Sequence, residues 1–159
     1  MAANNDQPLI SAVLARNIVE CRRLIDTGEA YVNEDKDNDG RTAVHWACSN
    51  GHLEIVRLLL CQGADMSIRD NDGDTALHDA SSNGHLEIVQ LLLCQGADMS
   101  IRDDNGWTAL DWASSKGYLK EIAVCLRKWP WTMAIIALKE DLAVYHLLDA
   151  STLIDLWQY

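Results

Sequence analysis

Residues 49–70 read SNGHLEIVRLLLCQGADMSIRD, and residues 82–103 repeat them as SNGHLEIVQLLLCQGADMSIRD. Only Arg57 and Gln90 differ between the two copies, which lie 33 residues apart. The preceding segments align at the same offset: DNDGRTAVHWA at 37–47, DNDGDTALHDA at 70–80 and DDNGWTALDWA at 103–113. Repetition at a fixed period indicates a stack of like units, in which each unit buries its apolar surface against its neighbours.

Each unit carries the signals of a turn followed by two short helices. Asp, Asn and Gly in DNDG favour a tight turn, and Thr42 is placed to cap the helix that follows. Asn50 and Gly51 end that helix, because glycine suits the left-handed conformation after a helix. Apolar residues then recur at helical spacing, which predicts second helices over 53–61 and 86–94, each followed by a stopping glycine.

The period and the Thr-x-Leu-His core resemble the ankyrin-repeat family. Three residue types recur at fixed phases: Gly40, Gly73 and Gly106, then Thr42, Thr75 and Thr108, then Ala47, Ala80 and Ala113. The proline that usually follows threonine in the family is alanine in this chain. The resemblance implies an all-α solenoid of helix-turn-helix repeats with β-hairpin-like tips, and apolar runs after Pro130 predict a helical C-terminal cap in addition.

The repeats divide the chain into five predicted segments. These are a degenerate N-terminal ankyrin repeat over 1–36, ankyrin repeats over 37–69, 70–102 and 103–129, and a helical C-terminal extension over 130–159. The extension begins at Pro130, where the repeat pattern fades. We interpret it as a cap that covers the last repeat, with an element that docks another factor as the alternative. A further interpretation is that the chain is a fragment of a longer protein.

Charge and composition exclude several classes of function. The chain has 24 acidic and 13 basic residues, a formal charge of −11, and the acidity is concentrated in the middle of the sequence. Nucleic acids and anionic membranes need clustered Lys and Arg, so neither is an expected partner. The start of the chain is not a signal peptide, and no run approaches the roughly 20 apolar residues of a membrane span. We therefore expect an intracellular protein, cytoplasmic or nuclear.

Residues that suggest metal or catalytic chemistry are better explained by the repeats. The segment 35–40 matches half of a calcium loop, but Trp46 stands where the bidentate Glu should be. Histidine copies one repeat apart are expected roughly 10 Å from each other, too far to share a tetrahedral zinc. The five cysteines form no CxxC pair, and no nucleophile or phosphate-loop motif occurs. We predict no catalytic residue, no cofactor and no metal.

The resemblance places the partner site on a concave face made by the tips and the outward side of the first helices. The repeats diverge at these positions although their second helices are near-copies. The predicted partner-binding residues are Arg41, Trp46, Asp72, Asp74, Asp79, Trp107 and Trp112. This set puts a tryptophan on either side of an acidic centre, and Trp and Arg are frequent in binding hot spots. The alternative is that the tryptophans only pack between helices and the aspartates are only solvated.

The predicted function is therefore a non-enzymatic protein–protein interaction module. Its partner would be a protein with a basic or mixed apolar and basic surface, and the chain would be a monomer. Two alternatives remain at this point. The chain is an adaptor whose repeats bind a client while residues 130–159 recruit effector machinery, or it is the regulatory part of a larger protein.

Overall fold

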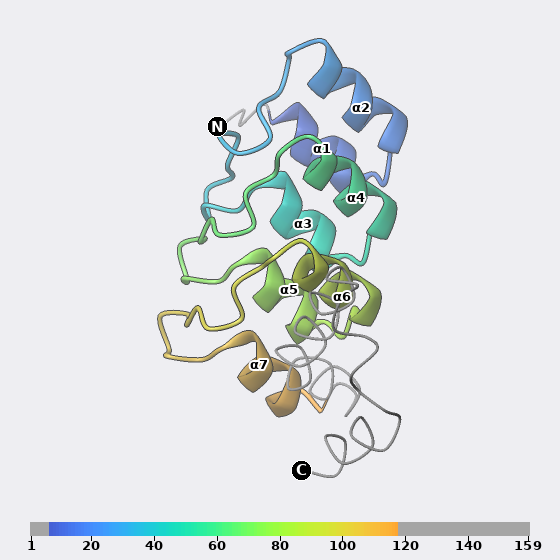
Figure 1. Ribbon diagram of the computed structural model, residues 1–159. Helices are drawn as coiled ribbons and strands as arrows, with labels where there is room; N and C mark the ends of the chain where they lie inside the picture. The colour runs from blue at the N-terminus through green and yellow to red at the C-terminus, as the bar shows by residue number, and fades with distance from the viewer. Residues whose placement is uncertain (1–6, 118–159) are drawn as a thin grey trace, which may run out of the picture. The chain divides into compact units, whose positions relative to one another are not determined.

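The computed structural model describes residues 7–117, which form short helices arranged in pairs (Figure 1). The helices are α1 Pro8–Leu14, α2 Ile18–Asp26, α3 Ala43–Ser49, α4 Leu53–Cys61, α5 Ala76–Ser82, α6 Leu86–Cys94 and α7 Ala109–Ser115. The bounds of α4 and α6 confirm the predicted second helices. Residues 7–117 contain no β-strand, only isolated bridges between Lys36 and Thr42 and between Arg102 and Thr108. The all-α class is thereby confirmed, whereas the predicted extension over 130–159 lies outside the described residues.

A threonine and a histidine together begin each of the helices α3 and α5. In α3 the backbone N–H of Thr42 donates to His45 Nδ1 at 3.2 Å, and the Thr42 hydroxyl lies 2.8 Å from the same nitrogen. Because Nδ1 accepts, the proton of the neutral ring is on Nε2. Burial lowers the pKa of His45, which keeps the ring neutral. The recurring Thr-x-x-His spacing is thus a reciprocal helix cap.

The helices stack in two rows, with the first helices α1, α3, α5 and α7 in one and the second helices α2, α4 and α6 in the other (Figure 1). Neighbours in the first row contact each other more extensively than neighbours in the second row. Alanines allow this close approach: Ala43, Ala47, Ala76, Ala80, Ala109 and Ala113 are at most 1% exposed. Larger side chains such as Leu59 and Leu92 are fully buried on the second helices, each worth roughly 1.5–3 kcal/mol.

Backbone hydrogen bonds join the turn of one repeat to the turn of the next. Asn71 N donates to Asp39 O at 2.9 Å, and Asp104 N donates to Asp72 O at 3.0 Å. These bonds satisfy polar groups that the turns would otherwise leave to water. They also fix the positions of successive turns relative to one another. Side chains carried by the turns therefore form a row with a defined spacing.

The turn between α3 and α4 meets the following repeat at Gly51. This glycine has φ +71°, and a Cβ there would lie 2.7 Å from the ring of His85. His85 is held in place because its Nε2 donates to Ser49 O at 3.1 Å. Gly63, which follows α4, also has a positive φ of +81°, but a Cβ at that position would have no neighbouring atom within 4 Å. The two glycines thus share a backbone conformation and differ in surroundings.

We expect Gly51→Ala to destabilise the protein more than Gly63→Ala. Both substitutions place alanine in the left-handed region at a cost of about 1–2 kcal/mol. Only Gly51→Ala also forces the His85 ring out of the repeat interface. Chemical denaturation of the two variants measures the difference. Equal losses of unfolding free energy would contradict the close inter-repeat contact.

Candidate functional site

The first aspartate of each turn organises the face formed by the turns and the first helices, which we call the tip face. In the turn before α3, Asp37 Oδ1 accepts the backbone N–H groups of Asp39 at 3.0 Å and Arg41 at 2.8 Å. Its other oxygen, Oδ2, accepts the indole N–H of Trp46 at 2.7 Å. One carboxylate therefore shapes the turn and fixes the orientation of a tryptophan on the following helix.

The turn before α7 repeats this arrangement. Asp103 Oδ1 accepts from the backbone of Asn105 at 2.9 Å and of Trp107 at 2.8 Å, and Oδ2 accepts from the Trp112 indole at 2.9 Å. Burial acts to raise the pKa of Asp103, but hydrogen bonds from Trp107, Trp112 and Asn105 lower it overall. The carboxylate is therefore ionised at neutral pH and is only 5% exposed.

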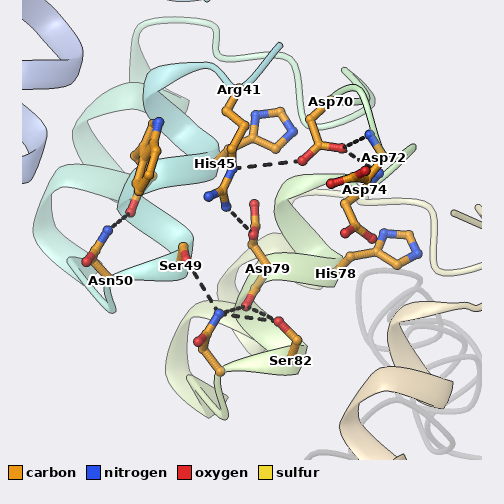
Figure 2. A network of polar contacts seen from close by, with 12 residues as sticks. Arg41, His45, Ser49, Asn50, Asp70, Asp72, Asp74, His78, Asp79 and Ser82 are labelled. Carbon is orange, nitrogen blue, oxygen red and sulfur yellow. Dashed lines mark hydrogen bonds and ion pairs between the residues drawn. The ribbon is translucent and has the colours of Figure 1, made fainter. Parts of the chain in front are cut away.

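The middle repeat differs because Asp79 stands where the other repeats have tryptophan. Asp70 Oδ1 still accepts from the backbone of Asp72 and Asp74, but no indole reaches Oδ2. Arg41 of the preceding repeat fills this position instead, with Nε 3.8 Å from Asp70 Oδ2 (Figure 2). The same guanidinium forms an ion pair with Asp79.

Arg41 also stacks on a tryptophan of its own repeat. Its guanidinium carbon lies 4.4 Å from the centroid of the Trp46 ring, within the range of a cation–π interaction. The side chains of Arg41 and Asp79 are 17% and 11% exposed, so the ion pair is largely screened from water. The chain's own guanidinium thus occupies the centre of the tip face, between Trp46 and the acidic residues of the next repeat.

Burial changes the ionisation of the two central carboxyl groups. Burial raises the pKa of Asp79 to about 6, against the opposing effect of Arg41. Arg41 is itself buried, but the charges of Asp79, Asp70 and Asp37 outweigh that burial and raise the pKa of its guanidinium. Burial followed by repulsion from Asp70 and Asp79 raises the pKa of Asp74 to about 7. Near neutral pH the centre is therefore less negative than its aspartates suggest.

Two indole rings form the end of the tip face nearest α7. The centroids of Trp107 and Trp112 are 5.0 Å apart with an interplanar angle of 56°, and Trp107 is 39% exposed. The backbone of Trp107 is anchored to the previous repeat, since His78 Nε2 donates to its carbonyl oxygen at 3.2 Å. Both rings are therefore positioned by aspartate and histidine side chains rather than by local packing alone.

The seven sequence-predicted residues lie on this face but in different surroundings. Asp72 and Trp107 are exposed, Arg41, Trp46, Asp74 and Trp112 are partly buried, and Asp79 is buried. Sequence reasoning missed the organising role of Asp37, Asp70 and Asp103. The signal that could have found them is that an aspartate recurs at the first position of each of these turns. An aspartate there typically accepts hydrogen bonds from the backbone N–H groups of the turn.

The structure of residues 7–117 also shows how possible metal ligands, the cysteines and the apolar helices are placed. No group of three His, Cys, Asp or Glu side chains in this part of the chain is placed to hold a metal ion. Its four cysteines are free thiols, with Cys21 and Cys48 buried and Cys61 and Cys94 exposed. None of the helices that the structure describes has the length and apolar character needed to cross a membrane.

We expect Arg41→Met to destabilise the protein by about 3 kcal/mol at pH 8, because it leaves Asp79 buried without its cation. The loss of unfolding free energy caused by Arg41→Met should be smaller at pH 5. The folded-state pKa of Asp79 is already raised above its unfolded value and rises further without Arg41, so protonation removes the unpaired charge as pH falls. Unfolding free energies at the two pH values measure the effect.

The double variant Arg41→Met with Asp79→Asn is the matched control for this prediction. It removes both charges, so its stability at pH 8 should exceed that of the single variant. An equal loss at pH 5 and pH 8 in the single variant would contradict a buried ion pair at the centre of the tip face.

Comparison with known proteins identifies the family. A family model described as ankyrin repeats matches residues 9–60, 44–93 and 77–127, which together cover well over half of the chain. Human 26S proteasome non-ATPase regulatory subunit 10 is 49% identical over 63 residues, covering 36% of this chain and 28% of that protein. Bovine acyl-CoA-binding domain-containing protein 6 is 44% identical over 55 residues, or 35% of this chain and 19% of the relative.

A probable E3 ubiquitin-protein ligase of rice, XBOS33, is 36% identical over 61 residues, covering 38% of this chain and 12% of the relative. The chain thus spans less than a third of the length of each of these three relatives. The relatives carry different names, as expected of a fold on which unrelated functions are placed. The family-model matches over three overlapping stretches, together with the helical repeats, show that this chain belongs to the ankyrin-repeat family.

Proposed function

We propose that this chain is a non-enzymatic protein-binding module that holds a partner protein on its tip face. Ankyrin repeats are generally protein–protein interaction modules, and the family is generally non-enzymatic. The observation that carries the proposal is where the repeats differ. Two second helices are near-copies, yet the residues at 41, 74 and 107 and at 46, 79 and 112 change from one repeat to the next.

The position of these differences favours binding over packing as their cause. Core positions such as Leu59 and Leu92 are copied because a change there costs stability. Backbone bonds hold the turns in a row of fixed spacing, and exposed turn residues such as Asp72 and Trp107 can change there with little effect on the stack. A repeat protein acquires a specific surface in this way, with the fold held constant.

The partner that fits best is a protein with a basic or mixed basic and apolar surface. Residues 37–103 hold 11 acidic residues against four arginines, a net of −7. Asp72 and Trp107 are the exposed members of the predicted set. Exposed carboxylates attract a basic partner over a distance, and an exposed indole contributes apolar contact once the partner has arrived.

We expect a tip variant, Asp72→Lys with Trp107→Ala, to lose partners that the wild-type protein captures from a lysate of its source cells. The matched control is Glu87→Lys with Tyr31→Ala, which changes charge and aromatic surface equally on exposed parts of α6 and the loop after α2. Mass spectrometry identifies the captured proteins, and circular dichroism checks that both variants are folded. Equal capture by the tip variant and the wild type would contradict the proposal.

The same capture with residues 130–159 deleted addresses the adaptor alternative. The name of the rice relative, a probable ubiquitin ligase in which the matched repeats form a small share, supports keeping this alternative. An adaptor loses one group of partners and keeps the other on deletion. If the segment is a cap, its deletion instead lowers the stability of the remaining repeats, which thermal unfolding of the shortened chain detects.

A further inference from the structure

Within the tip face, the α7 end contains a shallow pocket whose residue combination the α3 and α5 repeats lack. It is lined by Trp107, Asp111, Ser114 and Ser115, and the Trp107 ring stands beside Trp112. The α3 repeat has Arg41 at the phase of Trp107, and the α5 repeat has Asp79 at the phase of Trp112. The pocket therefore combines aromatic surface with a carboxylate, and no guanidinium is among its lining residues.

The centre of the tip face shows how such a combination binds a cation. Arg41 lies 4.4 Å from the centroid of Trp46 while its charge is matched by Asp79 and Asp70. Stacking on an indole combined with pairing to carboxylates is a stable arrangement for a guanidinium. A partner's arginine cannot use this central position, because Arg41 already fills it.

Among residues 7–117, the hydrogen bonds that Asp111 accepts from Thr108 all use one carboxylate oxygen, and no donor of this part of the chain bonds to the other. Asp111 Oδ2 accepts from the Thr108 backbone N–H at 2.9 Å and from the Thr108 hydroxyl at 2.7 Å. These bonds lower the pKa of Asp111, so the group is ionised at neutral pH. Asp111 is exposed and belongs to no ion pair among residues 7–117. A cation seated on the Trp107 ring would lie beside this charge.

The indole of Trp112, beside the pocket, already contacts one cation of the chain. Lys116 Nζ lies 5.4 Å from the centroid of the Trp112 ring, which leaves the exposed Trp107 ring for a ligand. Arginine has an advantage over lysine at such a site, because its planar guanidinium stacks on the indole and donates to the carboxylate at the same time. The net negative charge of residues 37–103 favours a positively charged partner as well.

We propose that the pocket lined by Trp107 and Asp111, with Trp112 beside it, binds an arginine side chain from a basic segment of the partner protein. This inference rests on the proposed function and adds the chemical group that the tip face recognises. It also assigns separate tasks to two parts of the face. The centre, next to Trp46, is closed by the chain's own Arg41, and the α7 end is open to the partner's arginine.

The test uses the full chain and a blocked peptide in which three arginines alternate with glycines. Matching peptides with lysine or with citrulline, the uncharged analogue of arginine, are the probes for comparison. The indole N–H signals of the nitrogen-15-labelled protein are followed by NMR, with Trp107→Phe and Trp112→Phe used for assignment. We expect the arginine peptide to shift the Trp107 and Trp112 signals, the lysine peptide to bind more weakly, and the citrulline peptide to bind at least about fivefold more weakly.

Asp111→Asn should weaken binding of the arginine peptide by about two- to fivefold, because it removes the charge. The asparagine retains an oxygen that can accept a hydrogen bond from Thr108. Asp104→Asn is the matched control, because it removes an exposed turn carboxylate that is paired with Arg69. Trp107→Ala should abolish the shift of the Trp112 signal. Its folding is checked by the remaining indole signals.

Several results would overturn the inference. They are equal shifts with the citrulline peptide, shifts confined to Trp46, an equal effect of Asp104→Asn and Asp111→Asn, or shifts produced by dilution alone, which would indicate a second copy of the chain on this face. These results can be distinguished from results that contradict the proposed protein-binding function. If the tip variant loses cellular partners while the arginine peptide leaves Trp107 and Trp112 unaffected, only the arginine pocket is wrong.

Discussion

The carboxylate that begins each turn is the interaction on which the tip face depends. In the turns before α3, α5 and α7, one oxygen accepts two backbone N–H groups and so fixes the turn. The other oxygen faces a donor from a side chain: the indoles of Trp46 and Trp112, or the guanidinium of Arg41. The residue that supplies this donor decides which side chain each repeat presents on the tip face.

The middle repeat shows the consequence of changing that donor. With Asp79 in place of tryptophan, the turn carboxylate of Asp70 would face a second carboxylate at the same site. Arg41 reaches across the repeat boundary and compensates both charges. A substitution in one repeat is thus coupled to a residue in the previous one, and the link ties two adjacent repeats together beyond their apolar packing. Residues at the centre of the face therefore contribute to stability, whereas at its α7 end the exposed ring of Trp107 is freer to vary.

The fold was predictable from sequence because its signals are local and repeated. Thr42, Gly51 and the apolar residues of 53–61 each determine one turn or one helix, and the structure confirms the helices they predicted. The predicted site residues lie on one face, but their surroundings were not predictable in the same way. Arg41 and Asp79 are 38 positions apart in the sequence. The repeat period predicts where each residue lies in its own repeat, but it does not predict that the two side chains meet. Burial of Asp79 follows from that long-range contact, so it required the structure.

The central claim is that the tip face, and not the outer side of the second helices, holds the partner. Amide hydrogen exchange of the full chain, free and bound to a captured partner, tests it most directly. We expect slower exchange in the bound state at the turns 38–41, 71–74 and 104–107, with 53–61 and 86–94 unchanged. Protection confined to 53–61 and 86–94, with the turns exchanging as in the free protein, would contradict the claim.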